Sequence, residues 1–272
     1  MANTSKKTTK STAKTVESAA EKKRFYKINN LYSKSPFSKV STTAILILGL
    51  VLFGGIAVFT TFAVMAHNND TKASADEYAY LRGLASDVEQ AYDDDGVIKL
   101  SALHNEMYAI NPDYVCWIRI GGTSIDHPVV RGQDNEKYLG ITFNGEENRY
   151  GAIFMDYRNT GEKLPHIIIY GHNARDGSMF TDLKKFLDPT FLEQNRTITL
   201  IVNGAEVEFE IYSARQSDIE DPAYYLDLGT TRNFTRFADR VEAPLRATQI
   251  LTLSTCVSGG NDDARMIVQA YR

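Results

Sequence analysis

The chain has 272 residues, a formal net charge of −4 at pH 7 and a hydrophobic content of 43%. These values suit one folded domain with a core of its own. Nothing in the sequence resembles a glycine-rich phosphate-binding loop or a nucleic-acid-binding surface, so we expect no nucleic-acid partner.

Charge is distributed unevenly along the chain. Residues 1–40 hold nine Lys and one Arg against two Glu, a net charge of +8, which leaves −12 for the remainder. This basic, Ser/Thr-rich tail is typical of a segment without regular structure. It either contacts anionic lipid headgroups or acts only as a topology signal.

An uncharged apolar run follows the tail. Ala44–Ala66 is, at about 1.5 Å per residue, long enough to cross a hydrocarbon core of about 30 Å as one helix. We expect a transmembrane signal-anchor over 41–67 and a linker over 68–75. The positive-inside rule then places the N-terminus in the cytoplasm and residues 76–272 outside the cell.

A cleaved signal peptide is the alternative, because basic residues precede the apolar run. Signal peptides have an apolar region of only about 7 to 15 residues. His67-Asn68-Asn69-Asp70 also lacks a clear cleavage signature. The run therefore favours an uncleaved anchor.

Helices are expected first in the extracytoplasmic part, and strands afterwards. Apolar residues recur at helical spacing over Ala75–Tyr92 and Leu100–Ala109. Eight short β-rich segments with turn residues between them predict a closed barrel, with both helices packed on its outside. The predicted strands are Tyr114–Ile120, Ser124–Val130, Ala152–Met155, His166–Tyr170, Thr197–Val202, Val207–Ala214, Ile250–Thr255 and Met266–Tyr271.

One long segment, Ser217–Ala243, interrupts this series of strands. Within it, Thr230–Val241 has the N-cap and the apolar spacing of a helix. We expect this helix-bearing loop to build a substrate groove. Tyr224 and Tyr225 either line that groove or pack the helix onto the barrel.

Three chemically active side chains stand at predicted strand ends. Cys256 follows the apolar run Gln249–Thr255, so its thiol is expected at a strand tip. His172 follows the strand that ends at Tyr170, and Arg265 opens the last strand. The three strand ends are predicted to meet in one cleft.

These residue types suit nucleophilic catalysis by a cysteine. A thiol with a pKa of about 8.5 is only slightly ionised at neutral pH, and a neighbouring imidazolium or guanidinium favours the thiolate. Cys256 would attack a carbonyl, and His172 would protonate the leaving amine. Arg265 would bind the negative oxygen of the tetrahedral intermediate. The expected product is a thioester to the enzyme.

The motif Thr252-Leu253-Ser254-Thr255-Cys256, with a distant His172 and a following Arg265, resembles the signature of sortases, the membrane-anchored cysteine transpeptidases of Gram-positive bacteria. Class B sortases are the more specific resemblance, over about residues 76–272. The segments that carry it are Asn111-Pro112-Asp113, Trp117-Ile118, Ile125-Asp126, Pro128-Val129-Val130, Asp134-Asn135, Tyr138-Leu139, Ile153–Asn159, Tyr170-Gly171-His172-Asn173 and Asp176–Phe180. The resemblance implies a mainly β fold, an eight-stranded sortase barrel with a helix in the loop before the cysteine strand. It also implies Cys256 as nucleophile, His172 as acid/base and Arg265 as transition-state clamp.

Further residues are candidates for substrate binding. Ser254 and Thr255 belong to the motif, and the hydroxyl of Ser254 either faces the cleft or bonds to backbone within the strand. Asn173 binds substrate, orients His172 or caps the turn after the strand. The loop from Cys256 to Arg265 is short, and its length and composition vary among sortases, so no contact is transferred from it.

Cys116 stands where sortases commonly have a small residue, and its apolar neighbours indicate core packing. A structural disulfide between Cys116 and Cys256 would exclude the enzyme interpretation. His104, His127 and His166 show no metal-site spacing, and Asp93–Asp95 predict a solvated turn. We expect no metal and no other cofactor.

The resemblance implies a membrane-anchored transpeptidase that cuts a C-terminal sorting motif of exported surface proteins after its Thr. The acyl group would pass to an amine of peptidoglycan or of its lipid-linked precursor. Class B resemblance favours motifs of the Asn-Pro-x-Thr type or a near variant. Three alternatives remain: a pilus-polymerising sortase, a cysteine peptidase without transfer, and a non-catalytic wall-binding module.

Overall fold

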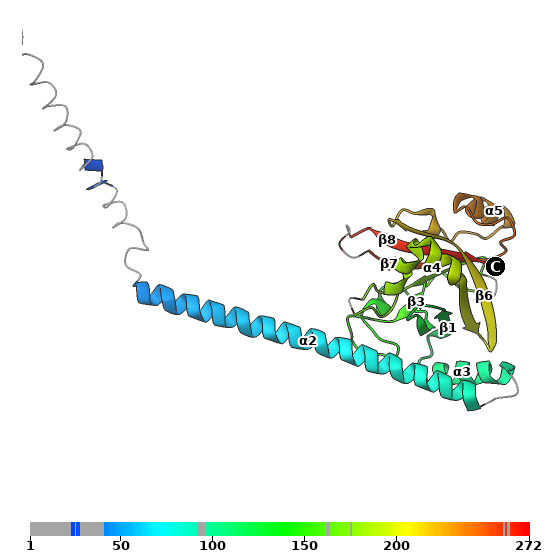
Figure 1. Ribbon diagram of the computed structural model, residues 1–272, viewed down its shortest axis with the longest axis horizontal. Helices are drawn as coiled ribbons and strands as arrows, with labels where there is room; N and C mark the ends of the chain where they lie inside the picture. The colour runs from blue at the N-terminus through cyan, green and yellow to red at the C-terminus, as the bar shows by residue number, and fades with distance from the viewer. Residues whose placement is uncertain are drawn as a thin grey trace, which may run out of the picture. The chain divides into compact units, whose positions relative to one another are not determined.

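The computed structural model describes residues 41–91, 96–161, 164–174, 176–257, 259 and 262–272, together with Lys23, Arg24, Tyr26 and Lys27 (Figure 1). Most of the predicted basic tail and the acidic triplet Asp93–Asp95 lie outside the described residues. The chain divides into two compact units, Met1–Met65 and Ala66–Arg272.

Helix α2 (Thr42–Ala91) contains the predicted anchor. In the part of the chain that the structure describes, this helix alone holds a stretch long and apolar enough to cross a membrane, with a mean hydropathy of 2.5. Residues 68–75, expected as a linker, are helical and continue α2 without a break. They contain neither Pro nor Gly, the residues that most strongly end a helix.

Eight strands close into the predicted barrel, in the order β1-β2-β3-β4-β7-β8-β6-β5. Their bounds are β1 (Tyr114–Ile120), β2 (Asp126–Val130), β3 (Ile153–Met155), β4 (His166–Tyr170), β5 (Thr197–Val202), β6 (Ala205–Ser217), β7 (Ile250–Cys256) and β8 (Arg265–Tyr271). Strand β6 is longer than predicted because its first half pairs with β5 and its second half with β8. Every predicted strand is present.

Two pairings position the ends of three strands. β4 and β7 are parallel neighbours, with Tyr170 opposite Ser254. β7 and β8 are antiparallel, with Cys256 opposite Arg265. The C-terminal ends of β4 and β7 and the N-terminal end of β8 therefore meet at one edge of the barrel.

The two predicted helices pack on the outside of the barrel. They are the last part of α2 and α3 (Gly96–Ile110), drawn in cyan to green in Figure 1. Leu81 of α2 and Leu103 and Met107 of α3 are fully buried against the barrel core. Burial of one such side chain contributes roughly 1.5 to 3 kcal/mol, so both helices belong to the folded unit.

The segment between β6 and β7 forms η4 (Pro222–Tyr224) and the predicted helix, α5 (Thr231–Arg240). The Thr230 hydroxyl caps α5 by accepting a hydrogen bond from the Asn233 amide at 3.2 Å. Phe237 packs in a small separate core with Leu228, Val241 and Ile250. Within residues 96–272, the described short helices also include η2 (Lys137–Leu139), η3 (Thr181–Leu187) and α4 (Pro189–Gln194).

Candidate active site

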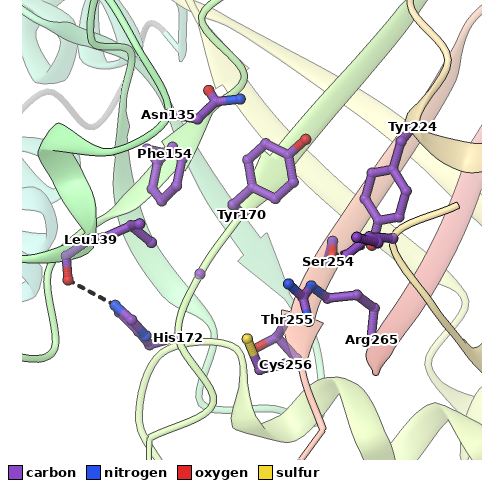
Figure 2. A pocket seen from close by; sticks show the side chains of 12 residues that line it. Asn135, Leu139, Phe154, Tyr170, His172, Tyr224, Ser254, Thr255, Cys256 and Arg265 are labelled. Carbon is purple, nitrogen blue, oxygen red and sulfur yellow. Dashed lines mark hydrogen bonds between the residues drawn. The ribbon is translucent and has the colours of Figure 1, made fainter. Parts of the chain in front are cut away.

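Cys256 is the last residue of β7 and the first exposed one after a run of buried strand residues. It opens into a cleft of about 340 Å³ at the barrel edge, shown in Figure 2. The cleft is lined by Asn135, Leu139, Phe154, Tyr170, Gly171, His172, Ile219, Tyr224, Ser254, Thr255, Cys256 and Arg265. The cysteine, histidine and arginine singled out in the sequence thus share one cavity.

His172 leaves β4 on the other side of the cleft. Its Nε2 lies 2.8 Å from the carbonyl oxygen of Leu139 (Figure 2). A carbonyl can only accept, so Nε2 carries a proton and donates it there. Nδ1 is then the ring nitrogen left to exchange a proton with another group.

Gly171 sets the direction in which His172 leaves the strand. A Cβ at this position would lie 2.8 Å from the ring of Phe180 and 3.3 Å from Ile153. After Gly171 the chain turns back, and the Phe180 amide donates to the His172 carbonyl at 3.0 Å. The absence of a side chain therefore lets the loop fold tightly against the barrel.

Arg265 opens β8 directly opposite Cys256 in the strand register. Its Nη1 donates to the carbonyl oxygens of Asp262 at 2.7 Å and Ala264 at 3.0 Å. The guanidinium has five N–H donors, so these two bonds hold it in place and leave others for a ligand. In Figure 2 the Cys256 sulfur lies between this guanidinium and the His172 ring.

An aromatic wall closes one side of the cleft. The rings of Tyr170 and Tyr224 are nearly parallel, with centroids 6.5 Å apart. The Tyr170 hydroxyl donates to Asp156 at 2.9 Å, and Tyr224 and Ser254 share a hydroxyl–hydroxyl bond of 2.7 Å. Burial raises the pKa of Tyr224, so its phenol stays neutral. Ser254 lines the cleft, and its hydroxyl bonds to Tyr224 rather than to the backbone.

Only some of the residues predicted to bind substrate line the cleft. Ser254, Thr255 and Tyr224 line the cleft, whereas Asn173 and Tyr225 do not. The side-chain amide of Asn173 donates to the carbonyl of Cys256 at 2.8 Å, so it braces the loop after β4 against the end of β7. The Tyr225 carbonyl accepts a hydrogen bond from His166, and its side chain is exposed.

Several lining residues were not singled out from the sequence. Asn135, Leu139, Phe154 and Tyr170 lie in segments that carry the sortase resemblance, which was the available signal. Ile219 lies in no such motif, and its place in the cleft comes from the course of the loop after β6.

Cys116 and the other histidines lie apart from this chemistry. Both cysteines are free, and burial raises the pKa of Cys116 to about 12. Burial lowers the pKa of His127 and of His166 to about 4. Among the described residues, no three His, Cys, Asp or Glu side chains gather closely enough to hold a metal ion.

Comparison with known proteins identifies the family. A sequence model described as "Sortase domain" matches residues 118–272. The chain belongs to the sortase family. Sortase B of Listeria monocytogenes is 31% identical over 242 residues, which cover 83% of this sortase and 93% of the relative.

Solved structures similar to this chain are also sortases of class B. A Staphylococcus aureus sortase B–substrate complex has a TM-score of 0.66 and 26% identity, covering 74% of this chain and 97% of that one. A sortase B complexed with triglycine has the same TM-score, identity and coverage, 0.66, 26%, 74% and 97%. This sortase is therefore of class B, a cysteine transpeptidase that anchors proteins to the cell wall.

Proposed function

We propose that Cys256 is the nucleophile of this transpeptidase, His172 its acid/base and Arg265 its transition-state clamp. The observation that carries the proposal is the strand register. Tyr170 opposite Ser254 and Cys256 opposite Arg265 place all three groups around one cleft. The orientation of His172 supports it, because Nε2 is occupied by the Leu139 carbonyl and Nδ1 is left for proton transfer.

The reaction then proceeds in two halves. His172 Nδ1 takes the thiol proton, Cys256 Sγ adds to the scissile carbonyl, and the guanidinium of Arg265 binds the oxyanion, a contribution of about 3 to 4 kcal/mol for one such donor. The imidazolium returns the proton to the departing amine, which leaves a thioester. A second amine attacks the thioester, gives its proton to His172, and expels the thiolate with formation of a new amide bond; the thiolate then takes the proton back from His172.

The sorting motif of the substrate is proposed to be of the Asn-Pro-x-Thr type or a near variant. Class B membership supports this motif, and the cleft offers both an apolar aromatic wall and the polar Tyr224–Ser254 pair for its first residues. The acceptor is proposed to be a primary amine of peptidoglycan or its lipid-linked precursor. The relative complexed with triglycine supports an amine-bearing acceptor.

We also propose a single-pass membrane protein with its N-terminus in the cytoplasm. The basic residues of 1–40 and the uncharged run Ala44–Ala66 support this orientation. In this arrangement 1–40 is the cytoplasmic tail, 41–67 the anchor, 68–75 a helical connection and 76–272 the catalytic domain outside the cell.

The test uses the full chain in detergent, as wild type and as Cys256→Ala. Quenched peptides with Asn-Pro, Ser-Pro and Leu-Pro motifs are supplied with and without a glycine or diamino-acid nucleophile, and products are read by mass spectrometry. We expect cysteine-dependent cleavage, an amine adduct and preference for Asn-Pro. Cleavage to free acid alone with excess amine would contradict transfer, and turnover by Cys256→Ala would contradict the proposed nucleophile.

A further inference from the structure

The carbonyl of Leu139 determines which nitrogen of His172 is protonated, and the Leu139 amide donates to the Glu136 carbonyl at 3.0 Å. Leu139 is 46% exposed, and it ends the short helix η2. The preceding residue, Tyr138, is buried, and its hydroxyl donates to Asp113 at 2.7 Å. The Tyr138 side chain and the turn's own hydrogen bond hold one side of this segment. On the other side, its carbonyls contact a later stretch of the chain.

This later stretch, Asn148–Ala152, lies directly against η2, and we call it the returning segment. The Asn148 amide donates to the Gly140 carbonyl, and the Ala152 amide donates to the Tyr138 carbonyl, both at 2.9 Å. Gly151 has a φ of +53°, and a Cβ there would lie 2.2 Å from the Tyr138 oxygen and 2.9 Å from the Leu139 oxygen. The returning segment thus defines the positions of the carbonyls on both sides of Leu139.

Helix α2 in turn holds the returning segment. The Asn148 side-chain amide donates to the Asp70 carbonyl at 2.9 Å. The hydroxyls of Thr71 and Tyr150 are 2.8 Å apart. Further along the helix, the Tyr78 hydroxyl donates to the Gly151 carbonyl at 3.2 Å.

The same stretch of helix makes two more contacts of this kind. Glu77 accepts from the Asn144 amide at 2.9 Å, and His67 Nδ1 lies 2.7 Å from Arg149 Nη1. We call residues His67–Tyr78 of α2 the clamp segment. These residues belong to the second compact unit and follow the apolar run of the anchor in sequence.

We propose that the clamp segment positions His172 for catalysis, through Asn148 and Tyr150 to the Leu139 carbonyl. This inference deepens the proposed function, because it rests on His172 as the acid/base. Asn148, Tyr150 and Thr71 are positioning residues that do not touch substrate. A carbonyl held in place at Nε2 fixes the tautomer and the orientation of the ring, and keeps Nδ1 as the nitrogen for proton exchange. The chain next to the anchor is then part of the catalytic apparatus.

Thr71→Val tests the proposal in the full-length enzyme in detergent micelles, since valine keeps the shape of the side chain and removes the hydroxyl, which also donates to the His67 carbonyl at 2.9 Å. Thr71→Ser restores the hydroxyl, and Tyr150→Phe removes the partner of the same bond. Thr248→Val is the matched control, because the Thr248 hydroxyl donates to the Arg272 carbonyl at 2.9 Å, at the opposite end of β7. Two readouts are measured: kcat and KM across pH, and the ¹⁵N shifts of His172, assigned by their loss in His172→Gln.

We expect Tyr150→Phe to lower kcat about two- to tenfold, the range for loss of one hydrogen bond, and Thr71→Val to lower it at least as much, both with little change in KM. The pH profile should shift and the ¹⁵N shifts should report less Nε2–H tautomer. The double variant should lose no more than Thr71→Val alone, and Thr71→Ser and Thr248→Val should resemble wild type. The proposal would be overturned if Thr71→Val lowered the Tm but left the ¹⁵N shifts of His172 and the pH profile as in wild type. Full activity of His172→Gln would instead overturn the proposed acid/base role of His172. This failure can be told apart from a failure of the clamp-segment proposal, because the ¹⁵N shifts do not depend on turnover.

Discussion

Tyr170 on β4 and Ser254 on β7 face each other in a parallel strand pair, and the amide after Tyr170 donates to the Ser254 carbonyl at 3.2 Å. Parallel neighbours end at the same edge of a sheet. The residues two positions beyond each partner, His172 and Cys256, therefore emerge on the same side of the barrel. One hydrogen-bonded register thus brings an imidazole and a thiol from distant parts of the chain into the same cleft.

Arg265 is expected to act by geometry as well as by charge. Arg265→Lys keeps the positive charge but loses the planar fork that bonds to the backbone and faces the cleft. We predict a fall in kcat of about 10- to 100-fold for Arg265→Lys and about 100- to 1000-fold for Arg265→Ala. Steady-state kinetics with a quenched peptide measures both. Arg196→Lys, at an exposed ion pair with a long 3.9 Å separation, should leave kcat unchanged; equal losses at the two sites would contradict a specific role.

Gly171 is expected to tolerate no side chain. Gly171→Ala places a methyl group 2.8 Å from the Phe180 ring, so either the ring or the loop that carries His172 must move. We predict a loss of about 1 to 3 kcal/mol in unfolding free energy, as for overpacking, together with reduced kcat. Urea unfolding and peptide cleavage measure the two effects. Gly121→Ala, where a Cβ meets nothing within 4 Å, is the control and should change neither.

The two thiols are expected to differ in reactivity. Cys256 is exposed in the cleft, whereas Cys116 is buried with its pKa raised to about 12, which suppresses the reactive thiolate. Iodoacetamide at neutral pH should modify Cys256 alone in the folded enzyme and both cysteines after unfolding. Peptide mapping by mass spectrometry reports the sites. Modification of Cys116 in the folded state would show that β1 opens to solvent.

Asp221 is expected to make stability depend on pH. Burial acts to raise the pKa of this carboxyl, but hydrogen bonds from Arg215 at 2.6 and 3.0 Å and from the Ala223 amide outweigh it, so the pKa lies below its ordinary 3.8. The folded state therefore binds the proton less tightly than the unfolded chain. The stabilisation is present in full above the ordinary pKa and is lost as the pH falls through the lower folded value.

Asp221→Asn should therefore lower the unfolding free energy by about 1.5 to 3 kcal/mol at pH 7, the range for a charged hydrogen bond. The difference from wild type should shrink as the pH falls below the ordinary carboxyl pKa, because wild type then loses the same interaction. Urea unfolding over a pH series measures this. Asp218→Asn, at an exposed carboxylate, is the control; a difference from wild type that stays constant with pH would contradict the linkage.

Sequence reasoning was most successful where the signal is local. Alternation, turn residues and apolar runs predicted all eight strands, and the Thr230 cap with its apolar spacing predicted α5. The sequence pattern placed the start of the helix before the barrel too late, at Ala75, because many of residues 68–75 are polar. In the structure these residues belong to α2. A polar surface helix and a short polar connection have similar composition, and only the packing around them separates the two.

The sequence by itself determined that the chain carries a thiol, an imidazole and a guanidinium at strand ends, because strand and turn patterns depend on neighbours a few residues apart. Only the tertiary structure decided that β4 runs parallel beside β7, that Leu139 holds Nε2 of His172, and that Asn173 braces Cys256 rather than lining the cleft. Each of these depends on hydrogen bonds between segments tens of residues apart. Such bonds form only when the closed barrel brings their partners together, so no local pattern records them.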